Sequence, residues 1–148
     1  MNNLTPSLQA SITKNLFQIL CQESKLFSKP IKTDPVLQRE LQFIGAMSQP
    51  LQKLPEDIVI SQGGRTTALY FLSKGECRVT CTDFAGRKND VCKIRAGGVF
   101  GEISYLLKCR RTATVRCIDY ASILYLPRIE GYRFKHLSAL LKDQFMQY

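Results

Sequence analysis

The segment from Gly97 to Val115 contains the residue types best suited to hold an anion. A glycine turn leads into a predicted helical turn over Glu102–Leu107, and paired arginines and two threonines follow. The start of a helix presents backbone N–H groups without a helical partner, and such groups bind anions. The planar, permanently charged guanidinium of arginine fits a phosphate. The segment therefore predicts a phosphate site, with a barrel corner carrying solvated arginines as the alternative.

Glu102 narrows the chemistry of that ligand. A carboxylate repels a nearby phosphate, unless the carboxylate faces a hydroxyl group of the same ligand. A nucleotide carries both a phosphate and ribose hydroxyls, so it would satisfy the arginine and the glutamate together.

Cysteine and histidine form no metal motif in this sequence. There is no CxxC pair, and the only histidine, His136, lies far along the chain. Because the chain is too long to need disulfides, we expect its cysteines to be small buried hydrophobic residues in a reducing cytosol. No base or nucleophile has an evident partner, so we expect neither a metal site nor an enzyme. The six cysteines are Cys21, Cys77, Cys81, Cys92, Cys109 and Cys117.

The middle of the chain is predicted to form short strands separated by glycine turns. In one of them Cys77, Val79 and Cys81 alternate with Arg78 and Thr80, which predicts one apolar and one polar face. Several short strands at this spacing are typical of a small barrel or jelly roll. The predicted strands are Asp57–Ser61, Ala68–Leu72, Cys77–Thr82, Asp90–Ile94, Ala113–Cys117 and Ser122–Leu126.

Helical patterns flank the strands. Apolar spacing predicts helices near Leu8–Leu20 and over Pro35–Met47, with the Ser28–Pro35 segment as the turn between them. Residues Ile129–Tyr148 are again helical, with an apolar stripe made of Phe134, Leu137, Leu141 and Phe145. The predicted fold is α+β: a small antiparallel β-barrel of jelly-roll type with flanking N-terminal and C-terminal helices and a short phosphate-binding helix.

A known family shares the pattern of the phosphate segment. Phe100-Gly101-Glu102, eight variable residues and then Arg111-Thr112-Ala113-Thr114-Val115 resemble the phosphate-binding cassette of cyclic nucleotide-binding domains. The similarity is greatest to the domains of cyclic-nucleotide-gated, hyperpolarisation-activated and related voltage-gated potassium channels. Leu69-Tyr70-Phe71-Leu72 with Gly75, and the positions Asp57 and Gly63, match upstream, so the resemblance covers about 51–126.

The resemblance implies a role for each cassette residue. Arg111 would pair with the phosphate of cAMP or cGMP, and backbone amides near Ile103 and Ser104 would complete the anion site. Glu102 would accept a hydrogen bond from the ribose 2′-hydroxyl, and Gly101 would allow close backbone approach. A further residue, Thr112, resembles the hydroxyl that contacts phosphate and guanine, which leaves cGMP open as a ligand. The apolar residues expected against the base are Val79, Cys92 and Ile94.

Two positions depart from the family pattern. Thr66 stands where the family has the second glycine of the Gly63 loop, so the conformation of that loop is open. The family also closes its pocket with a long C-terminal helix, for which only about 138–148 remain here. We therefore expect the lid to be abbreviated or cut short.

The resemblance also implies a domain organisation. Residues 1–50 would be a helical segment that resembles the end of a channel linker and offers a contact for homo-oligomers. Residues 51–127 would be the cyclic nucleotide-binding barrel, and 128–148 the C-terminal helical segment. The expected function is cyclic nucleotide sensing in a cytoplasmic gating domain of an ion channel, whose remaining parts would be its partner. The alternatives are a kinase regulatory subunit, a structural or assembly domain without a ligand, and a nucleic-acid binder.

The charge of the chain is concentrated around the cassette. Of a formal net charge of +9, the 30 residues from Arg87 to Arg116 supply +6. One phosphate needs only Arg111 and a helix start, so the remaining cations have no assigned partner. Aromatic residues do not alternate with the basic ones as in single-strand binding platforms, so we expect no nucleic-acid partner. No apolar run approaches the roughly 20 residues that span a bilayer, and Met1–Gln22 has no signal-peptide pattern.

Overall fold

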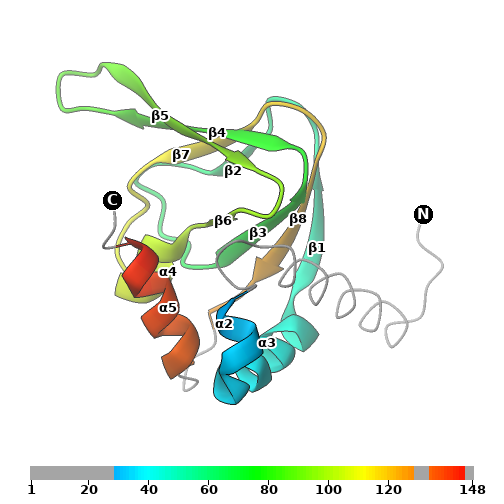
Figure 1. Cartoon of the computed structure of the whole chain (residues 1–148). Coiled ribbons are helices and arrows are strands. Elements are labelled where there is room, and N and C mark those ends of the chain that lie inside the picture. Colours follow the sequence, from blue (N-terminus) through cyan, green and yellow to red (C-terminus); the bar gives the residue numbers. More distant parts are fainter. Residues whose placement is uncertain (1–28, 129–133, 146–148) are drawn as a thin grey trace.

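Two four-stranded antiparallel sheets stack face to face in the computed structural model, which describes residues 29–128 and 134–145 (Figure 1). The strand order is β1-β8-β3-β6 in the first sheet and β2-β7-β4-β5 in the second. This arrangement confirms the predicted jelly roll with flanking helices. The strands are β1 (Gln49–Lys53), β2 (Ile58–Ile60), β3 (Leu69–Lys74), β4 (Glu76–Thr82), β5 (Lys88–Arg95), β6 (Val99–Phe100), β7 (Thr114–Cys117) and β8 (Ala121–Leu126).

Strand β3 explains why the first sheet can carry apolar layers on both sides. Its residues Leu69 and Phe71 belong to the cluster that the helices cover, whereas Tyr70 and Leu72 belong to the cluster between the two sheets. A continuous apolar run is typical of a strand buried on both faces. The sequence of β3 therefore fixes it in the middle of the molecule.

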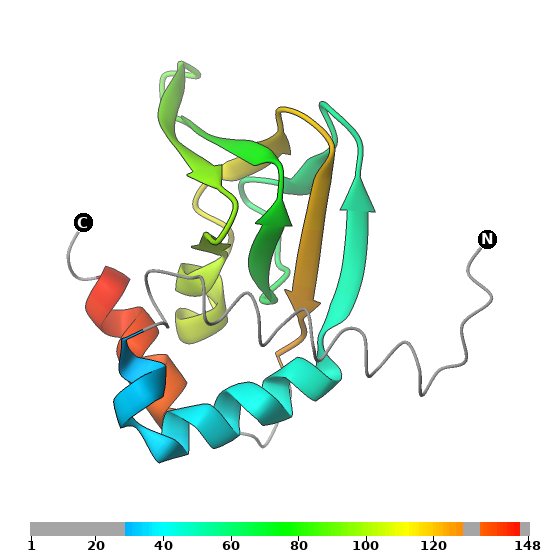
Figure 2. The ribbon, with the colours of Figure 1, turned by 45° about the vertical axis from the view of Figure 1, so that its right-hand side comes forward.

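The helices cover the outer face of the first sheet (Figure 2). The side chain of Asp34 caps α3 by accepting hydrogen bonds from the backbone N–H groups of Val36 and Leu37, both at 3.1 Å. From α3 and α5, Leu37 and Leu141 enter the same buried cluster as Phe71. The second sheet lies on the far side of the molecule from α3 and α5 (Figure 1). The described helices are α2 (Pro30–Thr33), α3 (Pro35–Met47), α4 (Glu102–Leu107) and α5 (Lys135–Phe145).

Each of the six predicted strands overlaps an observed strand, but three other elements were missed. The Ser28–Pro35 segment contains the short helix α2 rather than only a turn, because Pro30 begins the helix with its preset backbone angle. Strand β1 escaped prediction because it contains Pro50, which is tolerated at the edge of a sheet. The two-residue strand β6 lies inside the segment interpreted as a glycine turn.

The predicted alternation of β4 is wrong at Thr80, which is only 8% exposed. The pairing with β5 shifts register between Val79 and Thr80, so the side-chain environments no longer alternate regularly after Val79. Val79 and Cys81 are themselves only partly buried.

The cysteine prediction holds for only part of the set. Cys77 and Cys117 are buried with their sulfur atoms 3.9 Å apart, and burial raises the pKa of Cys77 to about 12. Cys92 is exposed, because it lies on the edge strand β5. Among the described residues, no group of three metal-ligating side chains comes together.

The predicted helix near Leu8–Leu20 lies outside the described residues, as do both ends of the predicted helix over Ile129–Tyr148. Within the described ranges, no helix has the length and apolar character needed to cross a bilayer.

Candidate functional site

A cavity of about 440 Å³ lies between the second sheet and the cassette. This volume lies in the range of small-molecule sites. The nine residues predicted from the sequence all line it. They are Gly101, Glu102, Ile103, Ser104, Arg111 and Thr112 of the cassette and Val79, Cys92 and Ile94 of the sheet.

The backbone turns into the cassette at Gly101, which has a φ of +84° and caps the N-terminus of α4. A Cβ at this position would lie 2.9 Å from both the Ala68 carbonyl oxygen and Arg111 Nη1. The position therefore requires glycine for its conformation and for its space. The first N–H groups of α4, including those of Ile103 and Ser104, have no acceptor within the helix and lie at the wall of the cavity.

Arg111 lines the cavity but is only 4% exposed. Three neutral oxygen atoms accept hydrogen bonds from its guanidinium. Its Nε donates to the Thr66 hydroxyl at 3.1 Å, Nη1 to the Gly101 carbonyl at 3.0 Å and Nη2 to the Ala68 carbonyl at 2.8 Å. Its Cζ lies 5.8 Å from the centre of the Tyr70 ring. Burial lowers the pKa of the guanidinium, but arginine stays charged at neutral pH. The site therefore holds an ordered buried cation.

The β2–β3 loop is bound to Arg111 through its backbone as well. The N–H of Gly63 donates to the Arg111 carbonyl, and the N–H of Arg111 donates to the Gly64 carbonyl, both at 2.8 Å. Thr66 in the same loop supplies the hydroxyl that accepts from Arg111 Nε. The departure from the family pattern at Thr66 thus adds a side-chain acceptor for the arginine.

Glu102 is the acidic group of this cavity. Burial raises the pKa of its carboxyl, while a hydrogen bond from its own backbone N–H and the charge of Arg111 act in the opposite direction. No ion pair to Glu102 forms within the described residues. The cavity therefore presents a cation and a carboxylate from one short segment.

The neighbouring Arg110 has a different environment. It is exposed, and its Nη1 donates to the Gly63 carbonyl at 3.2 Å. It does not line the cavity.

The family model of the cyclic nucleotide-binding domain matches residues 51–134, which is more than half of the chain. The chain belongs to the cyclic nucleotide-binding domain family. Domains of this family are regulatory rather than catalytic. A comparison with curated protein sequences gave no match.

Solved structures share the fold of this cyclic nucleotide-binding domain at low sequence identity. The regulatory subunit of a cAMP-independent protein kinase A from Trypanosoma cruzi, bound to guanosine, has a TM-score of 0.74 and 19% identity over 93% of this chain and 46% of its own. The regulatory domain of Toxoplasma gondii PKA with cAMP has a TM-score of 0.67 and 22% identity, over 90% of this chain and 46% of its own. The sensor domain of the transcriptional regulator DNR from Pseudomonas aeruginosa has a TM-score of 0.68 and 18% identity, over 90% of this chain and 86% of its own. The chain thus spans about half the length of these kinase regulators.

Sequence reasoning missed part of the lining of the cyclic nucleotide-binding domain's cavity. Ile60 and Val115 line it from β2 and β7, and Val91 and Lys93 from β5. Ile60 and Val115 could have been found, because both are apolar residues of predicted strands. None of the described residues of α5 lines the cavity.

Proposed function

We propose that the chain is a sensor of cAMP or cGMP and binds the nucleotide in the cavity between the second sheet and the cassette. The observation that carries the proposal is that one cavity gathers all nine residues predicted from the sequence. A buried cation and a carboxylate suit the phosphate and the ribose hydroxyl, and Val79 and Ile94 offer an apolar wall for the base.

In this proposal the phosphate completes the hydrogen bonding of Arg111. The guanidinium has five N–H groups, and three of them donate to Thr66, Gly101 and Ala68. A phosphate would take up remaining donors in charge-assisted bonds, which are stronger than those to neutral carbonyls. The N–H groups of Ile103 and Ser104 would hold the other phosphate oxygens. The protein thus orients the cation before the ligand arrives.

Glu102 would accept a hydrogen bond from the ribose 2′-hydroxyl. Burial disfavours the charged form of this carboxyl, and a hydrogen bond from the ribose hydroxyl would stabilise that charged form. Thr112 is exposed at the cavity wall and has its hydroxyl available for the phosphate or a guanine amino group.

Calorimetric titration of the full chain tests the ligand. We expect micromolar or tighter binding of cAMP or cGMP, and none of guanosine, because the nucleoside lacks the phosphate that Arg111 requires. Tight guanosine binding would replace the proposal with a nucleoside site. Absence of heat with all three ligands from the folded chain would favour an assembly domain without a ligand.

Paired variants separate binding from folding. Arg111→Lys keeps a cation but cannot reproduce three directed bonds, and we expect it to weaken nucleotide binding at least tenfold. Arg110→Lys is the matched control, since Arg110 is exposed and does not line the cavity. Equal affinities of the two variants would contradict the role of Arg111, provided that circular dichroism shows both to be folded.

We further propose that the effector is an ion channel, with this chain as its cytoplasmic gating domain. Support comes from the resemblance of the cassette to channel domains. Residues 1–50 would then link to the pore and mediate homo-oligomers, 51–127 would bind nucleotide, and 128–148 would respond to it. Ligand that binds one arrangement of the helices more tightly would shift the population towards it. Cyclic-nucleotide-dependent conductance of the full-length protein is the test.

A kinase regulatory subunit is the second candidate. Support comes from the fold that the chain shares with kinase regulators at 19–22% identity. Nucleotide-dependent inhibition of a kinase catalytic subunit, without any conductance, would decide for this alternative.

A further inference from the structure

Three cations lie side by side across the second sheet. Arg78 on β4 is the register partner of Lys93 on β5 and of Arg116 on β7. Their chain neighbours Val79, Cys92 and Val115 are also partners of one another, and all three line the cavity. Successive side chains of a strand point to opposite faces, so the side chains of the three cations share the outer face of the sheet, while Lys93, on the edge strand β5, also borders the cavity. We refer to Arg78, Lys93 and Arg116 as the cation row.

The cation row is poorly neutralised. Neighbouring strands are about 4.8 Å apart, and like charges directly opposite each other repel. The Nη1 of Arg116 lies 3.9 Å from a Glu56 carboxylate oxygen. For the side chains of Arg78 and Lys93, the described part of the chain offers no ion pair or hydrogen bond. Folding therefore places Arg78 and Lys93 together without a compensating partner among the described residues.

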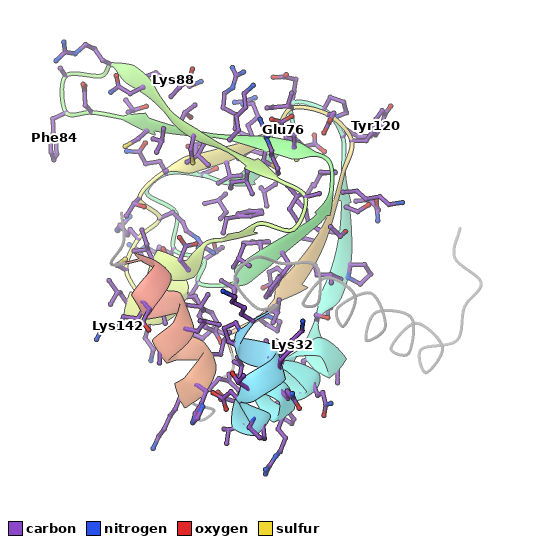
Figure 3. The ribbon with its side chains drawn as sticks, in the orientation of Figure 1. Lys32, Glu76, Phe84, Lys88, Tyr120 and Lys142 are labelled. Atoms are coloured by element: carbon purple, nitrogen blue, oxygen red, sulfur yellow. The ribbon has the colours of Figure 1, made fainter. Side chains whose placement is uncertain are left out.

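A projecting aromatic residue stands at the end of the same hairpin. Phe84 is fully exposed at the tip between β4 and β5, at the outer end of the hairpin (Figure 3). Hydrogen bonds close the tip: the Asp83 carboxylate accepts from the N–H groups of Ala85 and Arg87 at 3.0 and 2.9 Å, and the N–H of Asp83 donates to the Arg87 carbonyl at 2.9 Å. Within the described part of the chain, the turn thus presents the Phe84 side chain fully exposed.

The hairpin extends beyond the body of the molecule, on the side opposite the helices that carry Lys32 and Lys142 (Figure 3). The cation row and the aromatic tip therefore belong to the same sheet. The nucleotide cavity lies against the other face of the same strands.

We propose that the cation row and the hairpin tip bind an anionic lipid membrane. The cations would lie over acidic headgroups, and Phe84 would enter the interface, where aromatic side chains are favoured. A membrane needs no groove, only cations and a projecting apolar group on one side. A single-stranded nucleic acid would favour aromatic residues between the cations, whereas Phe84 lies at the end of the hairpin. Charge complementarity and the isolated aromatic tip therefore favour the membrane.

Co-sedimentation of the full chain with vesicles tests this proposal. We expect binding to phosphatidylcholine vesicles that contain phosphatidylserine, little binding to phosphatidylcholine alone, and weaker binding as salt rises. Arg78→Glu reverses the central charge of the row, and we expect it to lower partitioning about tenfold or more. Phe84→Ser should lower it several-fold.

Lys142→Glu is the matched control, because it makes the same change of net charge on α5, away from the hairpin. We expect it to have little effect on vesicle binding. Equal losses from Arg78→Glu and Lys142→Glu would overturn the proposal, as would binding that ignores phosphatidylserine. A third contrary outcome is that the chain binds single-stranded DNA or polyglutamate more tightly than vesicles, and that Phe84→Ser does not change this binding. That result would show that the outer face binds a soluble polyanion. Thermal unfolding of each variant verifies folding.

Discussion

Arginines at the two faces of the sheet β2-β7-β4-β5 differ in burial and in their neighbours. At the inner face Arg111 is buried and its guanidinium donates to three neutral oxygens, so its position is fixed by the protein. At the outer face Arg78 is exposed, and its register partners Lys93 and Arg116 are also cations. We therefore expect the first arginine to stabilise the fold and the second to destabilise it.

The difference shows that a buried cation and an exposed cation place different demands on the protein around them. A buried cation needs hydrogen-bond acceptors close to it, because an unpaired charge in the interior is strongly unfavourable. An exposed cation needs none, and its repulsion by neighbours is reduced by water and salt. Substitutions on the two faces should therefore change stability in opposite directions.

The largest effect is expected from Arg111→Ala. Removal of the guanidinium leaves the buried carbonyls of Ala68 and Gly101 without these donors, so the free energy of unfolding should fall by about 2–4 kcal/mol. Urea unfolding measures this loss. Arg110→Ala is the control and should stay within about 0.5 kcal/mol, because its side chain is exposed. Similar losses from both would contradict the structural role of Arg111.

The next effect concerns the turn that brings Arg111 and α4 together. Gly101→Ala should lower the free energy of unfolding by about 2 kcal/mol or more, from a positive φ and from contact with Ala68 and Arg111. Gly86→Ala has a similar φ of +80° but no atom within 4 Å of its new Cβ, so it should lose about 1 kcal/mol from strain alone. The difference between the two variants in urea unfolding isolates the contact; no difference would show that only φ matters at Gly101.

The sequence was sufficient to predict the cassette because its residues lie within one short segment. A glycine before a helical turn and an arginine a few residues later form a pattern that is visible in the sequence, and the resemblance to the family cassette implied the role of each residue. The six strands were predictable for a similar reason, since each has its own pattern of apolar residues and turn glycines.

What surrounds Arg111 was not predictable from spacing. Its acceptors Thr66 and Ala68 lie 45 and 43 residues away in the chain, and only closure of the two sheets brings them to the guanidinium. The register shift after Val79 also arises from pairing with β5, and it buries Thr80 against the expected alternation. Such features depend on tertiary contacts that no local pattern records.

A smaller effect, of opposite sign, is expected on the outer face. Arg78→Glu converts two like-charge pairs, with Lys93 and Arg116, into attractive pairs. The free energy of unfolding should rise by about 0.5–1 kcal/mol, and more at low salt than at high salt. Thermal unfolding at two ionic strengths measures it. A loss of stability would show that the cation row does not repel, and would remove the contrast between the two faces.

The smallest effect belongs to the helices, which lie apart from both faces. His136 Nδ1 lies 2.6 Å from Asp34 Oδ2, and the hydrogen bond to Asp34 raises the pKa of His136 and lowers that of Asp34. Glu40 also faces this end of α5, where its carboxylate accepts from the His136 N–H at 2.9 Å. Since the histidine pKa is raised in the folded state, its contribution is complete below its unfolded pKa of about 6.5 and is lost as pH rises through the folded value.

The melting temperature should therefore decline slightly as pH rises from about 6 to about 8. The carboxyl has the opposite dependence: Asp34 stabilises above its unfolded pKa of about 3.9 and loses this contribution only as pH falls through its lowered value. The titration of Asp34 therefore does not change stability between pH about 6 and about 8. His136→Gln removes the titrating group and should flatten the profile between pH about 6 and 8, while Arg78→Glu should preserve the decline. A decline that persists unchanged in His136→Gln would assign the pH dependence to another group and separate it from the contact between α3 and α5.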